Sequence, residues 1–238
     1  MKKLIFTLTL FLSTQFFAQD YRIAHKLISD KSVKLKYEFS ISFPVIKDFK
    51  DNITSMNLYN RFITTKAESI RDTFNLWMRD WDTTSISEMR SYYEAGDSVF
   101  YASNSLISVL FYENWYFSGA AHPNNSNFSV NYDLENHREL GLNDLLQPGW
   151  ENKISEICIR EITKQKQEWG IEPSEWLTEG AGPRAENFKV YNTAKSGLII
   201  TFQTYQVGSY VEGPSEVFID YEEIKSLIKP GSILAFVK

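Results

Sequence analysis

The sequence predicts an α+β protein whose mostly antiparallel sheet packs against one long N-terminal helix and a second, central helix. Residues 33–43 alternate apolar and polar side chains, which is the two-residue period of a strand with one buried face. Residues 52–81 place apolar side chains every three or four positions, as an amphipathic helix does. The later segments do not repeat a strand–helix–strand order, which favours antiparallel pairing.

The first strand and the long helix have predicted ends. Pro44 has no amide hydrogen to give to a sheet ladder, so it is expected to end the strand. Asp51 is the expected N-cap, because its carboxylate can accept a hydrogen bond from a free amide of the first turn. The aromatic end of the helix is expected to belong to the core. That end consists of Phe74, Trp77 and Trp81.

Residues 88–117 are expected to form a β-meander. Turn-forming residues at 95–97 and 103–105 divide the segment into strands. The stretch 106–117 is apolar on both faces, so we expect a central strand that is covered on both sides.

The rest of the chain is expected to contain short strands and a second helix. Helix 151–169 carries an apolar stripe that includes Cys158, and Asn143 is the expected N-cap of a short helix at 144–146. The other predicted elements are a strand around 128–132, a turn at 136–137, a loop at 173–183, a hairpin of 187–192 with 197–204, and a last helix at 221–228.

Residues 1–18 have the layout of a secretory signal peptide. A positive start, Met1 to Lys3, precedes the apolar stretch from Leu4 to Ala18. The stretch is shorter than the about 20 apolar residues that cross a membrane, so we expect cleavage rather than anchoring. No cysteine follows it to carry a lipid. The product is expected to be exported, periplasmic or extracellular, with no membrane span and no lipid. Cleavage would move the net charge from −5 to −7, because two lysines leave.

Composition and motifs argue against several function classes. The net charge of −5 argues against a nucleic-acid binder, which needs a basic face. The single cysteine, Cys158, cannot form an internal disulfide or a cysteine-based zinc site and is expected to be a buried small hydrophobe. The three histidines lack metal-ligand spacing, and no nucleophile or nucleotide motif is found. We therefore predict no catalytic residue, no metal and no cofactor. Carboxylates that meet only in the fold remain an open alternative.

His122 is the residue that raises a functional question. Three small residues precede it, so backbone or a partner can approach closely. The favoured interpretation is structural, with the imidazole bonded to the turn backbone; the alternative is contact with a partner or ion. The six tryptophans could also stack against sugars, although most are expected in the core. The better candidates flank loops: Trp150, Trp169 and Trp176.

Three stretches together resemble one family. They are SGAAHPNN (118–125) with NYDLENHRELGLNDLL (131–146), the segment 202–224, and the opening strand with the long helix. The chain is similar to the extracytoplasmic domain of RsiV-type anti-sigma factors, a unit that also occurs beside the catalytic domain of PdaC-type peptidoglycan deacetylases. In the family's first motif Ala120 and Pro123 replace glycines, and the hairpin glycine is replaced by Asn136 or His137. The matching positions are Gly119, Ala121, His122, Asp133, Leu134, Leu140, Leu142, Leu145, Tyr205, Gly213 and Tyr221.

The resemblance implies a binding module without the deacetylase or sigma-factor functions. We expect a non-catalytic protein of the cell envelope that binds a lysozyme-like muramidase or cell-wall glycan. The alternative is a carboxylate-dependent enzyme acting on cell-wall polysaccharide. The chain divides into residues 19–117 and 118–238, expected to pack as one globule, and its oligomeric state is not predicted. The candidate binding residues are Gly119, Ala121, His122, Asn124, Tyr205 and Gly213.

Overall fold

A computed structural model describes residues 20–81 and 90–236. The predicted signal peptide, residues 1–18, lies outside the described residues. Within those residues, no helix is both long and apolar enough to cross a membrane.

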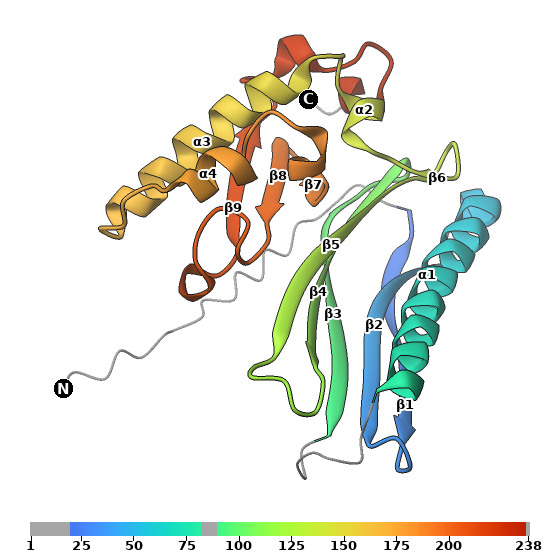
Figure 1. The fold of residues 1–238 in the computed structure, drawn as a ribbon. Helices are drawn as coiled ribbons and strands as arrows, with labels where there is room; N and C mark the ends of the chain where they lie inside the picture. Colours follow the sequence, from blue (N-terminus) through green and yellow to red (C-terminus); the bar gives the residue numbers. More distant parts are fainter. Residues whose placement is uncertain (1–19, 82–89, 237–238) are drawn as a thin grey trace.

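Six strands form the larger sheet, in the order β1-β2-β3-β4-β5-β6 (Figure 1). All neighbours pair antiparallel except β2 and β3, which run parallel because helix α1 returns the chain between them. The bounds are β1 Arg22–Ser32, β2 Tyr37–Lys47, α1 Ile53–Asp80, β3 Ser91–Ala102, β4 Leu106–Tyr116, β5 Asn124–Asp133 and β6 Arg138–Glu139. With a second, three-stranded antiparallel sheet described below, this confirms the predicted α+β class.

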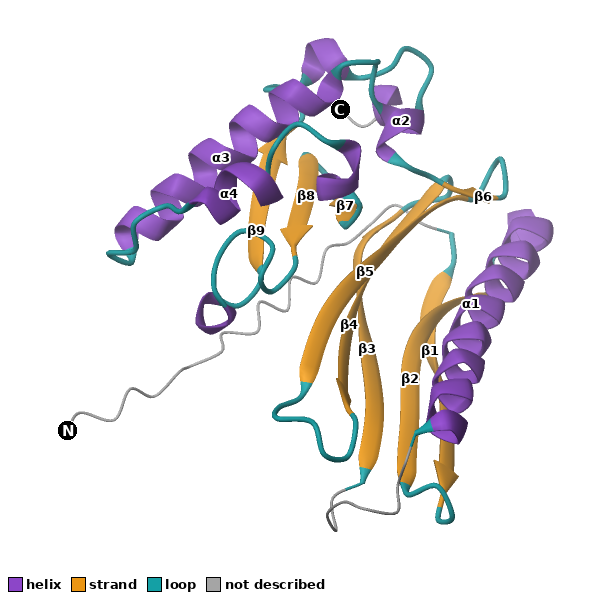
Figure 2. Ribbon diagram, in the orientation of Figure 1, coloured by secondary structure: helices purple, strands orange, loops and turns teal. Residues whose placement is uncertain are grey.

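Helix α1 lies along one face of this sheet, as Figure 2 shows. Its buried side chains recur at helical spacing and pack on the inward side chains of β2 to form one core. The N-cap is Asn52 rather than Asp51, because the Asn52 side chain accepts the Ser55 amide (3.0 Å). Phe74 is buried as predicted, but Trp77 and Trp81 are 51% and 38% exposed, so they lie at the edge of the core.

Pro44 does not end its strand. The alternation of β2 is as predicted, but the strand runs from Tyr37 to Lys47, while residues 33–36 form a turn. β3 pairs with β2 only as far as Ile41, so Pro44 lies where β2 has a strand partner on one side alone. A proline is tolerated at such an edge. On the free side, the Asn60 side chain of α1 accepts from the Ile46 amide (2.7 Å) and donates to its carbonyl (2.8 Å).

The meander is a long hairpin of β3 and β4. The predicted turn at 95–97 is wrong, because Ala95 pairs with both Ile41 and Glu113 inside the sheet, and Gly96 continues the strand. The turn at 103–105 is confirmed. β4 is central, as predicted, and separates two cores: Ile107 and Val109 face α1, whereas Leu106 belongs to the second core.

The second layer is a three-stranded antiparallel sheet, β7-β8-β9, flanked by α3 (Figure 1). Its core joins Trp150, Ile154 and Cys158 of α3 to the apolar side of β8 and β9. The bounds are α2 Leu142–Leu145, α3 Trp150–Glu168, α4 Glu175–Gly180, β7 Tyr191–Thr193, β8 Gly197–Phe202 and β9 Ser215–Asp220. The 3-10 turns are η1 Lys50–Asn52, η2 Ala185–Phe188, η3 Tyr210–Glu212, η4 Lys225–Leu227 and η5 Ile233–Phe236.

Several predictions for this layer need correction. Helix 151–169, the turn at 136–137 and the hairpin are confirmed with small shifts of their ends. α2 begins one residue after Gly141, and Asn143 instead accepts a hydrogen bond from Trp150 Nε1 (2.8 Å). The loop 173–183 contains the helix α4, and 221–228 forms tight turns and η4 instead of an α-helix.

Buried polar side chains join the two layers. Ser108 of β4 accepts hydrogen bonds from Asn192 Nδ2 (2.9 Å) and the Thr193 amide (3.1 Å) of β7. Asn131 of β5 donates to the Tyr191 carbonyl (2.7 Å). The larger sheet thus runs across the predicted division at 117/118, because β5 completes it.

Candidate functional site

Four exposed rings from three separate segments form a row, which we call the aromatic ridge: Trp176, Tyr205, Tyr210 and His122. Ring centroids lie 6.1 Å apart for Trp176 and Tyr205, and 5.4 Å apart for Tyr205 and Tyr210. The His122 ring lies 5.1 Å from Tyr210. The first three side chains are 43%, 53% and 39% exposed. Aromatic rings usually bury their surface, so a contiguous exposed row is a candidate binding surface.

The loop 203–213 carries two of these rings and is held from its inner side. Gln206 donates to the carbonyls of Gly180 and Asn187 (both 2.9 Å), and Val207 is buried. Gly180 closes α4 against this loop: a Cβ there would lie 1.8 Å from the Gln206 carbonyl oxygen, so no other residue fits. α4 and the loop therefore place Trp176 beside Tyr205.

Tyr205 has a strained backbone. Its φ is +69°, a left-handed conformation that costs a residue with a Cβ roughly 1–2 kcal/mol. Its neighbours fix the loop to the larger sheet. Gln203 accepts from the Asn127 amide (2.8 Å) and donates to the Asn127 carbonyl (2.6 Å), and Thr204 donates to Asn125 (2.7 Å). Surrounding contacts thus hold a strained residue that points its ring outward, which is common at functional sites.

An ion pair beneath the loop anchors the turn that carries Tyr210. Glu212 pairs with Lys166 of α3, and the two side chains are 14% and 5% exposed. Glu212 also accepts from the Ser209 amide (2.7 Å) and hydroxyl (2.9 Å). Burial alone would raise the pKa of Glu212, but Lys166 and Ser209 outweigh it and hold the pKa below its usual value. The carboxylate is therefore ionised and fully engaged.

His122 makes the bond to the turn backbone that the sequence favoured, whereas contact with a partner or ion stays a prediction. Its Nδ1 lies 2.8 Å from the Pro123 carbonyl, so Nδ1 donates that bond and the proton is on Nδ1. This is the structural bond to the turn backbone. The exposed ring also lies against Tyr210, whose hydroxyl donates to the same Pro123 carbonyl (3.5 Å). The turn thus fixes the last ring of the ridge.

The structure brings together two of the six candidate binding residues, His122 and Tyr205. Gly119 and Gly213 adopt positive φ, 95° and 70°, and shape the two loops. Asn124 lies in β5 opposite Trp115, and Ala121 is exposed in the turn. Of the candidate tryptophans, Trp176 lies in the ridge, Trp169 is exposed, and Trp150 is core, 1% exposed. Tyr210 is not among the residues predicted from the sequence, although Gly213 in the same segment, Ser-Tyr-Val-Glu-Gly, is a candidate.

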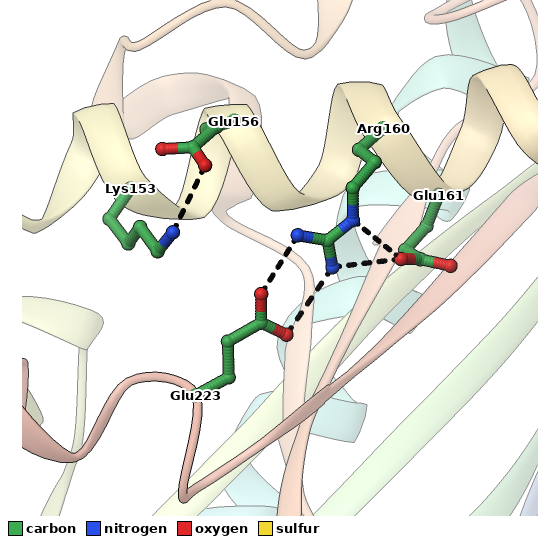
Figure 3. A network of polar contacts seen from close by, with 5 residues as sticks. All are labelled: Lys153, Glu156, Arg160, Glu161 and Glu223. Atoms are coloured by element: carbon green, nitrogen blue, oxygen red, sulfur yellow. Dashed lines mark hydrogen bonds and ion pairs between the residues drawn. The ribbon is translucent and has the colours of Figure 1, made fainter.

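The adjacent carboxylates Glu222 and Glu223 have different partners. Glu222 pairs with Lys225 (3.1 Å), whereas Glu223 accepts two hydrogen bonds from Arg160 (2.9 and 3.3 Å) in the network of Figure 3. The Arg160 guanidinium lowers the pKa of Glu223, so this carboxyl does not suit a general acid. Among the residues that the structure describes, no three His, Cys, Asp or Glu side chains gather as a metal site.

The chain is similar to the peptidoglycan-N-acetylmuramic acid deacetylase PdaC of Bacillus subtilis (strain 168). The two are 26% identical over 198 residues, which is 81% of this chain. The matched part is 39% of the length of the deacetylase, so this chain corresponds to about two fifths of that protein.

Two crystal structures share the fold. A member of the DUF3298 family from Bacteroides fragilis NCTC 9343 has a TM-score of 0.66 at 18% identity and covers 93% of this chain and 98% of its own. A DUF3298 protein from Pseudomonas aeruginosa PAO1 has a TM-score of 0.60 at 14% identity, with 89% and 96% covered. Residues 143–222, which span α2 to β9 and carry three of the four ridge rings, match the family described as "Protein of unknown function (DUF3298)".

Proposed function

We propose that the chain is a non-catalytic binding protein of the cell envelope and that cell-wall glycan binds along the aromatic ridge. The main observation that supports this proposal is the row of four exposed rings. The rings lie on α4 and on loops whose inner sides are hydrogen-bonded to the rest of the protein. Sugar rings have apolar faces that stack on aromatic side chains, while tyrosine hydroxyls and an imidazole can bond the sugar hydroxyls. A preformed surface needs little ordering when the glycan binds.

Two further observations support this choice. The name of the similar Bacillus subtilis protein states that it acts on N-acetylmuramic acid of peptidoglycan. An exported product, which the first eighteen residues predict, would meet the same polymer. The resemblance to RsiV-type ectodomains, which stays a prediction, implies a lysozyme-like protein instead. Glycan is favoured because three of the four ridge rings are uncharged aromatic side chains and the neighbouring carboxylate, Glu212, is already paired.

The engagement of Glu212 also argues against the enzyme alternative at this surface. A general acid must hold a proton near neutral pH, which requires a raised pKa. The pKa of Glu212 is lowered, and its oxygens accept from Lys166 and Ser209. Glu212 is thus unsuited to protonate a glycosidic oxygen.

Co-sedimentation with insoluble peptidoglycan sacculi tests the proposal. Trp176→Ala and Tyr205→Ala are each expected to weaken binding about two- to tenfold, since an aromatic contact contributes about 0.5–1.5 kcal/mol. Trp77→Ala is the matched control, because Trp77 is exposed to a similar degree on α1 and is expected to leave binding unchanged.

Two results would overturn the proposal. One is that the protein does not sediment with sacculi. Binding of a lysozyme-like muramidase by a protein that does not sediment with sacculi would count as the same result. The other is an equal loss of binding in the Trp77 and Trp176 variants, which would show that the ridge is not the binding surface.

A further inference from the structure

A second surface, on the opposite side of β5 from the second layer, is an open groove between α1 and the larger sheet. It encloses about 850 Å³. One wall is a single stripe of α1, and the floor is formed by β4 and β5. The stripe consists of Leu58, Arg61, Phe62, Thr65, Lys66, Ser69 and Ile70. These positions recur every three or four residues, so they share one face of the helix.

The middle of the groove is apolar. Phe62 and Ile70 of α1 and Phe128 of β5 are half-buried at its surface. Phe128 stacks on Phe111 beneath it, with ring centroids 4.4 Å apart, and Phe62 lies 4.8 Å from Tyr132. The floor is therefore an aromatic surface whose rings pack on other rings of the core.

Glu113 is a carboxylate at one end of the groove floor. Tyr93, which is 4% exposed, donates its hydroxyl to one carboxylate oxygen, and Ser126 donates to the other (2.5 Å). Burial, and then the bond to Glu113, raise the pKa of Tyr93, so its hydroxyl keeps the proton that it donates. Glu113 forms no ion pair within residues 20–81 and 90–236. Its charge is thus oriented but not neutralised by a cation of the described chain.

Positive charge lies toward the other end. The direction of α1 along the groove follows from two ring contacts. Phe74 lies 5.8 Å, between ring centroids, from Tyr93, the residue that bonds Glu113, whereas Phe62 lies against Tyr132 toward the other end. Near Phe62, Lys66 is paired with Glu139 (2.9 Å), while Arg61 is exposed and makes no ion pair in the described part of the chain. From Arg61 to Ile70 the helix rises about 14 Å, at about 1.5 Å per residue.

We propose that this groove binds a short extended peptide with free termini, its amino group at Glu113, its apolar side chains on Phe62 and Phe128, and its carboxylate at Arg61. An extended chain spans about 3.3–3.6 Å per residue, so about four residues match the length of the α1 wall from Arg61 to Ile70. The charges of the groove and of a zwitterionic peptide are complementary, and the apolar middle suits small aliphatic side chains. This site is independent of the aromatic ridge.

Isothermal titration calorimetry with the tetrapeptide Ala-Val-Val-Ala tests the site. The peptide with free termini is expected to bind with a Kd of about 1 mM or below. N-acetylation should weaken binding about tenfold or more, because a charged hydrogen bond is worth about 1.5–3 kcal/mol. Amidation of the carboxyl end should also weaken binding, and Arg61→Gln should remove the difference between acid and amide.

Variants of the protein give the second arm. Glu113→Gln should bind the free and the acetylated peptide equally, whereas the control Glu94→Gln, on the opposite face of the neighbouring β3, should behave as the parent. Tyr205→Ala should bind the peptide normally, which separates this site from the ridge. Two results with the parent protein alone would overturn the proposal. One is equal affinity for the free and the acetylated peptide, and the other is no detectable heat of binding at about 10 mM peptide.

Discussion

At the residue scale, Glu212 controls the turn that presents Tyr210. Glu212→Gln keeps the shape but leaves the Lys166 ammonium, 5% exposed, without a counter-charge. We expect the free energy of unfolding at pH 7 to fall by about 3 kcal/mol, as when one partner of a buried pair is removed. Urea denaturation measures this loss. The exposed pair of Glu223 and Arg160 gives the control: Glu223→Gln should cost less than about 1 kcal/mol because solvent screens it.

The same change has a defined pH dependence. The pKa of Glu212 is lower in the folded protein than in the unfolded chain, where it is about 4.3. Its contribution is therefore complete above about pH 4.3 and is lost as the pH falls through the lower folded value. The difference in stability between parent and variant should shrink below about pH 4. A difference that stays constant from pH 7 to pH 3 would contradict the assigned role of the pair.

Single residues of the ridge were partly predictable. The small-residue turn and the family resemblance both pointed to His122, and the resemblance pointed to Tyr205. Tyr210 was missed because its significance depends on contact with His122, a residue far away in the chain. Asp51 was predicted as the N-cap by residue type. Asn52 caps the helix instead, because Asn52 is the last residue before α1 with non-helical backbone angles (φ −145°, ψ 67°).

At the element scale, two amide side chains complete the free edges of the larger sheet. Asn60 bonds both the amide and the carbonyl of Ile46, and Gln203 does the same for Asn127. Unpaired edge groups invite pairing with another chain, and each amide removes one such pair. Gln203 also begins the loop that carries Tyr205, so the same two bonds attach the ridge to β5.

Gln203→Ala should therefore loosen the ridge without touching its rings. Amide hydrogen exchange in 203–213 is expected to quicken at least about fivefold, since two lost hydrogen bonds are worth about 1–3 kcal/mol, and sedimentation with sacculi should weaken. Asn60→Ala loses the equivalent bonds at the far side of the sheet. It should lower stability to a similar degree and leave exchange in the loop unchanged. Equal exchange in both variants would show that Gln203 does not anchor the loop.

Element types were more predictable than their ends. The helical period of 52–81 depends on one face being buried, and that is a local property of the sequence. The end of β2 and the absence of a turn at Gly96 depend on which strands lie alongside. Past Ile41, β2 has a strand partner only on its β1 side, and β3 continues through Gly96 because β4 pairs with it throughout that stretch. The sequence of one strand does not show which strands pair with it.

At the scale of the whole molecule, β4 belongs to two cores. Its alternate residues face α1 on one side and the second layer on the other, and its Ser108 is fully buried against β7. The sequence predicted that 106–117 is covered on both faces. This holds for residues 106–111 but not for Tyr112, which is 45% exposed, and the sequence did not say what covers them. The polar residues that join the layers, such as Asn131 and Asn192, look like surface residues in the sequence and are 2% and 0% exposed.

A shared central strand predicts that the two layers unfold together. Opening either core would expose one face of β4. Separating the layers would also leave the buried amides of Asn131 and Asn192 without partners, which costs about 1–3 kcal/mol for each group. Cys158 reports on the second core: it is buried, and burial raises the pKa of its thiol to about 12, so a thiol reagent should react only after α3 opens. Hydrogen exchange in α1 reports on the first core.

Along a urea series, thiol labelling of Cys158 and loss of protection in α1 should share one midpoint, as in a two-state transition. Ser108→Ala removes the hydroxyl that accepts from Asn192 and the Thr193 amide, and should lower both midpoints together. Thiol labelling that precedes the loss of α1 protection would mean that the layers are separate folding units. The ridge, which takes rings from loops of both layers, would then lose its shape whenever the second layer opened, and glycan binding would disappear at the lower midpoint.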